Sequence, residues 1–244
     1  MPRVLLLGGT TEATAMARAL AEAGIDAVFS YAGRTGTPAT QPLPVRSGGF
    51  GGVAGLAAYL TAERITHLVD ATHPFAAQIS RNALAAAADA GVPLIALERA
   101  PWAEGQGDRW TRVPDLEAAV IALGQVRRRV FLAIGRQNLA TFAKAPQHHY
   151  LLRLVDPPTE ALPLPDADAI IARGPFTVDG DRNLLRDHRI DAIVAKNAGG
   201  AGAEAKLTAA RALNLPVVLV DRPSIPDRPV ARTVPEVMAW LNRT

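Results

Sequence analysis

The sequence predicts an α/β protein of two parallel-sheet domains with a cleft between them. Short apolar runs alternate with segments of helical periodicity almost throughout the 244 residues, which is the pattern of parallel strands joined by helical crossovers. Hydrophobic residues make up 49% of the chain, enough for a packed core and too much for a disordered chain. Glycine or polar residues follow most of the apolar runs, and ligands bind at such strand ends in parallel sheets.

In the first half, strand and helix alternate in order. Two helices are expected to stop at Gly24 and Gly91, because glycine is favoured just past a helix end. The expected strands are residues 4–7, 27–30, 44–46, 67–70 and 93–97, and the expected helices are residues 11–23 and 74–90.

The second half shows the same alternation of strands and helices, and one short sequence pattern, called the echo below, occurs once in each half. Residues 110–115 lead into a helix at 116–123, and residues 231–236 lead into a helix at 237–241, each through a proline and an acid. The other expected strands are residues 130–134, 169–172, 192–195 and 216–220.

The echo predicts two Rossmann-like domains, each closed by the same strand–helix element. The expected division is a cofactor-binding domain at residues 1–125 and a second, substrate-binding α/β domain at residues 126–244. The alternative is one continuous sheet in which the echo is a coincidence.

Composition excludes several kinds of site. The chain has no cysteine, so disulfides, iron–sulfur clusters and thiolate nucleophiles are excluded. Its five histidines form no H-x-x-x-H pair, and no metal site is expected. The formal net charge is +3 and the one basic run is residues 127–129, whereas a nucleic-acid binder would cluster its basic residues. We therefore expect no nucleic-acid partner.

The sequence also predicts no membrane partner. No apolar run reaches the roughly 18 residues of a membrane-spanning helix, and the first residues enter an apolar strand without the pattern of a secretory signal. A soluble, cytoplasmic protein is expected, of unknown oligomeric state. Only three of the 26 basic residues are lysines. The excess of arginine fits a ligand with several carboxylates, which guanidinium pairs bidentately, and the alternative is a compositional bias of the genome.

The loop after the first strand holds Gly8, Gly9, Thr10 and Thr11. Glycines at such a turn let the backbone approach a phosphate, and the helix N-terminus directs N–H groups at it. We expect these four residues to bind a cofactor. The full G-x-G-x-x-G fingerprint is absent, so a plain tight turn capped by threonine is the alternative.

The residues after the second strand favour NADPH over NADH. NAD-specific folds carry an acid about 20 residues past the glycines to hold the ribose 2′-hydroxyl. Residues 30–35 contain no acid and include Arg34, which suits a 2′-phosphate. The alternative is that Arg34 is an ordinary loop arginine.

A second glycine loop follows the third strand, with four glycines among residues 48–52. Because such a loop costs folding entropy, we expect it to bring its backbone close to a ligand. Ser47, Gly48, Gly49 and Phe50 are the expected cofactor contacts. The alternative is a flexible connector.

The fourth strand ends at Asp70, and Thr72 and His73 follow it. All three residues should therefore lie beside the cofactor. Thr72 is an expected cofactor contact. Pro74 suits the first turn of the next helix. His73 could donate a proton or cap that helix.

Three strand ends in the second half carry one cation each. A single such cation is more often a solvated surface residue, but three at equivalent positions facing one cleft predict an anion site. The expected contacts are Arg136, Gln137, Arg173, Gly174, Pro175, Phe176, Lys196, Asn197, Gly199 and Gly200.

Taken in order, these segments resemble the precorrin-6A reductase family of cobalamin biosynthesis. The most specific one is Asp-Ala-Thr-His-Pro-Phe-Ala at residues 70–76. The other matching segments are residues 7–13, 48–52, 135–137, 172–176 and 196–200.

The resemblance implies a two-domain protein that binds NADPH mainly through its first domain and adds a hydride to the macrocycle of precorrin-6A, giving precorrin-6B. Asp70 and His73 are then the candidate catalytic residues, which would polarise the macrocycle or supply a proton. The substrate's many carboxylates fit the cations of the second half. Neither flavin nor metal is implied, and a metal-free and a cobalt-loaded substrate both remain open.

Two other functions remain open. One is a non-catalytic module that binds NADPH or a tetrapyrrole, and the other is an NADPH reductase of another small acidic substrate. Ligand loops in both domains favour an enzyme with two ligands.

Overall fold

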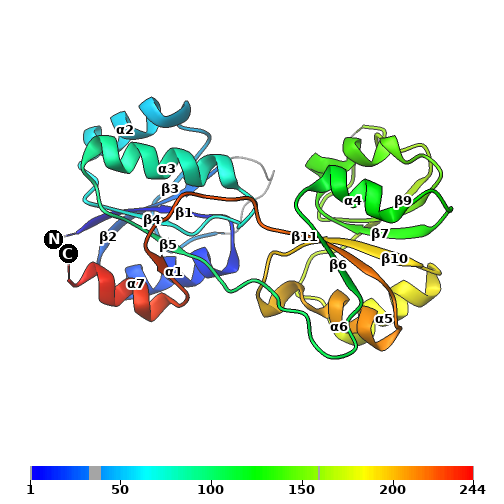
Figure 1. The fold of residues 1–244 in the computed structure, drawn as a ribbon. Helices are drawn as coiled ribbons and strands as arrows, with labels where there is room; N and C mark the ends of the chain where they lie inside the picture. The colour runs from blue at the N-terminus through cyan, green and yellow to red at the C-terminus, as the bar shows by residue number, and fades with distance from the viewer. Residues whose placement is uncertain (1, 33–39, 159, 244) are drawn as a thin grey trace. The chain divides into compact units, whose positions relative to one another are not determined.

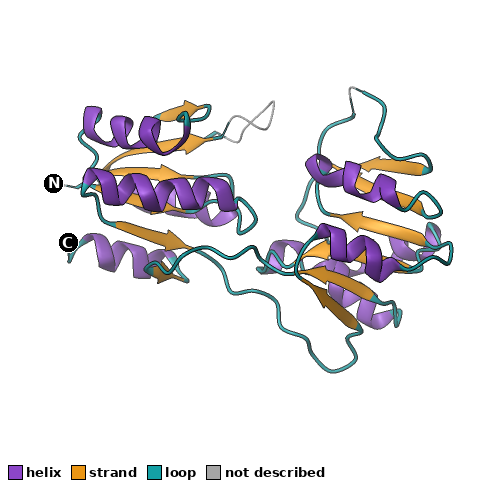
Figure 2. Cartoon of the chain, turned by 45° about the horizontal axis from the view of Figure 1, so that its top comes forward, coloured by secondary structure: helices purple, strands orange, loops and turns teal. Residues whose placement is uncertain are grey.

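The computed structural model describes residues 2–32, 40–158 and 160–243, which form two α/β units (Figure 1). Unit 1 is Met1–Ala100 with Ser224–Thr244, and unit 2 is Pro101–Pro223. Each unit contains one six-stranded sheet, with helices on its faces (Figure 2). The predicted fold class of two parallel-sheet α/β domains is confirmed.

The sheet of unit 1 has the strand order β3-β2-β1-β4-β5-β12, and every pair is parallel. This is the strand order of a dinucleotide-binding sheet. Its strands are β1 Arg3–Leu7, β2 Asp26–Tyr31, β3 Val45–Ser47, β4 His67–Asp70, β5 Leu94–Leu97 and β12 Val230–Ala231. Its helices are α1 Thr11–Glu22, α2 Gly52–Ala62, α3 Ala77–Ala90 and α7 Val234–Leu241.

Both faces of this sheet are buried, which explains the continuous apolar runs. Along β1, Val4 and Leu6 belong to the core under α1 and α7, whereas Leu5 and Leu7 belong to the core under α2 and α3. Successive side chains of a strand point to opposite faces, so a central parallel strand needs apolar residues at every position.

The sheet of unit 2 has the order β9-β8-β7-β10-β11-β6, again with parallel pairs. Its strands are β6 Trp110–Val113, β7 Arg129–Ala133, β8 His149–Leu154, β9 Ala167–Ile171, β10 Ala192–Lys196 and β11 Val217–Val220. Its helices are α4 Leu116–Leu123, α5 Val178–Asp187 and α6 Ala205–Ala212, with 3₁₀ helices η1 Arg136–Lys144 and η2 Ala201–Ala203.

The two sheets exchange their sixth strands, and the expected division at residue 125 therefore differs from the two units. β6 pairs with β11 in register Trp110↔Val217, and β12 pairs with β5 in register Val230↔Ala96. The echoed elements thus close equivalent edges, but each closes the sheet of the other half of the chain. Backbone pairing in the sheets, not proximity along the chain, sets the division.

Two local features also differ from expectation. β8 was not expected, although it is a nearly continuous apolar run that lies between β7 and β9. The helix expected from residue 74 begins at Ala77, because His73–Ala76 form a turn closed by a 2.7 Å bond from Ala76 N to His73 O. Pro74 occupies the second position of that turn, where its fixed φ is favoured.

Among residues 2–32, 40–158 and 160–243, no helix combines the length and the hydrophobicity that crossing a membrane requires.

Burial of His148 makes the stability of unit 2 depend on pH. The side chain is fully buried; its Nδ1 accepts from Arg128 N at 3.3 Å and its Nε2 lies 3.1 Å from Gly124 O. A neutral ring with the proton on Nε2 satisfies both contacts. Burial lowers the pKa of His148 from its ordinary value of 6.5, so its contribution to stability is complete above that pH and is lost as pH falls toward the folded-state pKa.

We therefore expect the urea midpoint of the parent to fall between about pH 8 and about pH 5, on either side of the ordinary histidine pKa. His148→Gln should lower the midpoint at the higher pH and show a shallower fall, because it has no proton to take up on unfolding. Other titrating groups contribute equally to both proteins. An identical fall in the variant would contradict this assignment.

Candidate functional site

The carboxyl ends of β1 and β4 meet where the strand order of unit 1 reverses, the usual ligand crevice of such a sheet. Thr10 joins the two loops there: its Oγ1 donates to Ala71 O at 2.8 Å and accepts from Ala13 N at 3.0 Å. The hydroxyl thus caps α1 and fixes the β4 loop. Since these two bonds engage the hydroxyl, we expect Thr10 to contact a ligand through its backbone.

The two glycines of this turn have different reasons to be glycine. A Cβ on Gly8 would lie 2.0 Å from the Phe29 ring, so Gly8 is required by packing. Gly9 has φ +124°, and within the described part of the chain no heavy atom lies within 4 Å of a Cβ built there. Gly9 therefore leaves open space at the start of α1, whose first residue is Thr11.

Asp70 is 4% exposed and organises its own loop. Its Oδ1 accepts from Thr72 N at 3.1 Å and from Thr72 Oγ1 at 2.7 Å, and that hydroxyl lies 3.3 Å from Ser80 Oγ. The carboxylate is thereby placed to position Thr72.

His73 is partly buried beside this loop. Its Nδ1 accepts from Phe75 N at 3.2 Å, so a neutral ring carries its proton on Nε2. The histidine thus stabilises the turn before α3 through Nδ1.

Arg46 holds the second glycine loop in place. It donates to Ser30 Oγ at 2.8 Å, to Gly48 O at 2.9 Å and to Gly49 O at 3.1 Å. Its guanidinium lies 3.8 Å from the centre of the Phe50 ring. The loop after Ser47 is therefore tied by hydrogen bonds, and its phenylalanine packs within unit 1.

Sequence patterns did not single out Arg46 as an organiser of this loop, although a cation two residues before a glycine-rich loop is a usable signal. Arg34, expected to bind the 2′-phosphate, lies outside the described residues.

In unit 2 the strand order reverses between β7 and β10. Gly135, Arg136 and Gln137 follow β7 and are exposed, while Lys196 ends β10. Burial lowers the pKa of the Lys196 ammonium. The structure thus brings two of the three expected cations to neighbouring strand ends.

The third expected cation, Arg173, follows the edge strand β9, which β8 separates from β7. Its Nη2 lies 3.9 Å from Asp156 Oδ1, and both side chains are 62% exposed. This is a loose surface pair. Gly174 and Pro175, the next expected contacts, are also exposed.

Arg153, on β8, stacks on the ring of Phe176. The sequence did not single out Arg153 because β8 itself was not expected. The Arg153 guanidinium lies 3.7 Å from the centre of the Phe176 ring and 5.0 Å from that of Phe131. It also pairs with the buried Asp181 at 2.5 Å. The loop after β9 is therefore fixed by a buried charge pair.

Asn197 is buried and serves the loop after β10. Its side-chain amide exchanges two hydrogen bonds with the Trp102 backbone, at 2.8 and 3.1 Å, and Trp102 Nε1 donates to Gly200 O at 3.1 Å. Asn197 and Gly200 thus fasten residues near 102 to this loop, with Gly199 between them in the left-handed region.

Comparison with known proteins identifies relatives along nearly the whole chain. The family model described as "Precorrin-6x reductase CbiJ/CobK" matches residues 3–242. A precorrin-6A reductase of Rhodobacter capsulatus is 66% identical over 241 residues, covering 99% of this chain and 96% of the relative. A cobalt-precorrin-6A reductase of Priestia megaterium is 30% identical over 253 residues, covering 99% of each.

Among solved structures, one titled "CobK precorrin-6A reductase" superposes with a TM-score of 0.96 at 66% identity. The match covers 100% of this chain and 97% of that chain.

Gly49→Val tests whether the second glycine loop meets a ligand. Gly49 has no left-handed φ, and in the described residues nothing lies within 4 Å of a Cβ built there, so the fold should accept valine. Overpacking against a bound cofactor costs about 1–3 kcal/mol, so the NADPH Kd should rise roughly 5- to 150-fold. Gly202→Val, equally unobstructed in unit 2, is the control. A Gly49→Val variant with the parent's melting temperature and NADPH affinity would reduce the loop to a connector.

Proposed function

Because the chain belongs to the precorrin-6x reductase family, we propose that it catalyses the NADPH-dependent reduction of precorrin-6A to precorrin-6B in cobalamin biosynthesis. The observation that carries this proposal is the high identity to a precorrin-6A reductase over nearly the full length of both chains. Identity is higher to relatives named for precorrin-6A than to those named for cobalt-precorrin-6A, which favours the metal-free substrate. We expect the reaction to take place in the cytoplasm.

Unit 1 fits a dinucleotide. The open space at Gly9, Gly48 and Gly49 would accept a cofactor close to the backbone, and the N-terminus of α1 favours a phosphate. The sequence supports NADPH through Arg34, as a partner for the 2′-phosphate. NADPH, when bound, supplies the hydride for the macrocycle.

The side chains of unit 1 would contribute mainly by positioning, which can lower a barrier by roughly 7–11 kcal/mol. Asp70 would act through Thr72 by fixing the loop after β4. His73, with its proton on Nε2, is the candidate that could hold or deliver a proton. Asp70 is thus proposed as a positioning residue and His73 as the candidate catalytic one.

Unit 2 would bind the acidic macrocycle. Arg136, Arg173 and Lys196 stand at strand ends of the same sheet edge, since all its strands are parallel. Their cations suit the carboxylates of a tetrapyrrole, and arginine does so with paired hydrogen bonds. A partly buried Lys196 is less screened by salt than an exposed one would be.

The direct test is the loss of NADPH absorbance at about 340 nm with precorrin-6A present, a standard property of the reduced cofactor. Oxidation of NADPH, faster than of NADH, is expected. Binding of both ligands without oxidation would support the non-catalytic alternative, and oxidation only with other acidic substrates would support a different reductase.

Arg173→Ala should raise the KM for precorrin-6A roughly fivefold, because an exposed charge contact is worth up to about 1 kcal/mol. The salt dependence of KM should weaken, while the NADPH Kd stays near the parent value. Stability should change little, since the pair with Asp156 is long and exposed. Arg182→Ala, which removes a surface partner of Asp179 in the same unit, is the control. An unchanged KM would exclude Arg173 from the substrate site.

A further inference from the structure

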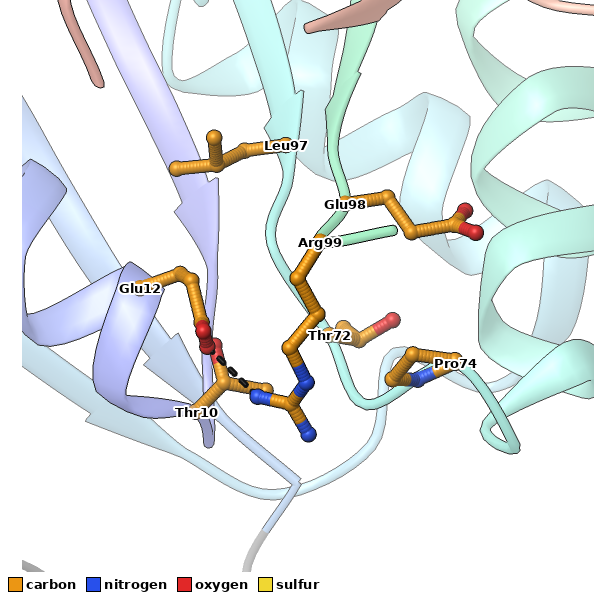
Figure 3. Close-up of a pocket in the computed structure, with 7 residues that line it drawn as sticks. All are labelled: Thr10, Glu12, Thr72, Pro74, Leu97, Glu98 and Arg99. Atoms are coloured by element: carbon orange, nitrogen blue, oxygen red, sulfur yellow. Dashed lines mark hydrogen bonds and ion pairs between the residues drawn. The ribbon is translucent and has the colours of Figure 1, made fainter. Parts of the chain in front are cut away.

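A small hollow opens between the β1–α1 turn, the loop after β4 and the end of β5 (Figure 3). Thr10, Thr72 and Leu97 line it together with charged side chains. It lies on the β4 side of the point where the strand order reverses. A dinucleotide in that crevice would therefore pass beside it.

The hollow contains an ion pair between Glu12 and Arg99. Arg99 Nη1 lies 2.7 Å from Glu12 Oε2, and the two side chains are only 18% and 26% exposed. Figure 3 shows the Arg99 side chain reaching back from the end of β5 toward Glu12 and Thr10. A pair this far buried is weakly screened by salt.

Glu12 places a negative charge at the turn where a phosphate would bind. It is in the first turn of α1, where the positive end of the helix attracts anions. A carboxylate there benefits from the helix but repels the diphosphate of a dinucleotide bound at the same turn. The guanidinium of Arg99 offsets that repulsion.

The backbone around Arg99 is fixed by the exchanged strand. Glu98 N donates to Ala231 O at 3.0 Å, and Arg232 Nη1 donates to Glu98 O at 2.8 Å. The Glu98 carboxylate is paired with Arg228 at 2.7 Å. The backbone of the residue before Arg99 and the guanidinium of Arg99 are thus both held in place.

We propose that Arg99 is a positioning residue for the cofactor: oriented by Glu12, it presents positive charge to the diphosphate that NADPH and NADH share. The inference rests on the proposed function, because it takes the dinucleotide site to be on unit 1. Glu12 has two effects in this proposal: its carboxylate orients Arg99, and its negative charge lowers the affinity for the cofactor.

Arg99→Met tests the first half of the proposal. The Kd values for NADPH and NADH, measured by titration without substrate, should both rise roughly tenfold or more, as a charge-assisted contact would require, with their ratio unchanged. Arg3→Met is the matched control: Arg3 pairs with Asp26 and Glu63 at the amino end of β1, on the opposite edge of the sheet, and its loss should leave both Kd values alone.

Glu12→Gln tests the role of Glu12. It also allows the proposal to be tested if Arg99→Met fails to fold. Glutamine still offers an oxygen to Arg99 but carries no charge, so both cofactors should bind severalfold more tightly. A merely structural ion pair would change the melting temperature and leave both Kd values within about twofold, an effect too small to matter energetically.

Three outcomes would overturn the proposal: an Arg99→Met variant that folds and binds both cofactors like the parent, selective loss of NADPH over NADH, or weaker binding in Glu12→Gln. Failure of the proposed function would look different, since the parent itself would then oxidise no NADPH with precorrin-6A, whatever the cofactor Kd values of the variants.

Discussion

Parallel pairing of all the strands in both sheets is the constraint on which the rest of the structure depends. It gathers the carboxyl ends of the strands at one edge of each sheet, so the loops that bear chemistry share that edge. The same strand order occurs in both units, which places the reversal between β1 and β4 in one and between β7 and β10 in the other. The Thr10 bond to Ala71 and the ends that carry Arg136 and Lys196 are at these two reversals.

The exchange of sixth strands links the candidate sites to distant parts of the chain. In unit 1, β12 holds the backbone at Glu98, beside Arg99. In unit 2, Trp102 and Arg222 both bind the loop after β10: Trp102 through the Asn197 side chain and Arg222 through the Asn197 carbonyl at 2.9 Å. Residues near both points where the chain passes from one unit to the other are therefore hydrogen-bonded to a candidate ligand loop or to a residue next to one.

The sequence predicted what depends on periodicity and strand ends, and missed what depends on tertiary pairing. Alternation of apolar runs and helices predicted the two parallel sheets, and the echo at residues 110–115 and 231–236 marked equivalent edges. Which sheet each edge joins depends on backbone pairing across more than a hundred residues, so the division at residue 125 did not follow. Arg153 was missed because its strand, β8, was not expected, and the stacking of Arg46 on Phe50 and of Arg153 on Phe176 depends on ring positions that the fold sets.

The proposed function divides the two ligands between the units, with the dinucleotide on unit 1 and the tetrapyrrole on unit 2. Amide hydrogen exchange with each ligand added singly measures this division most directly, because bound loops exchange more slowly. NADPH should slow exchange in residues 8–13, 47–52 and 70–74, and precorrin-6A should slow it in residues 135–137, 172–176 and 196–200. Protection of the unit 2 segments by NADPH, or of the unit 1 segments alone by precorrin-6A, would contradict the account.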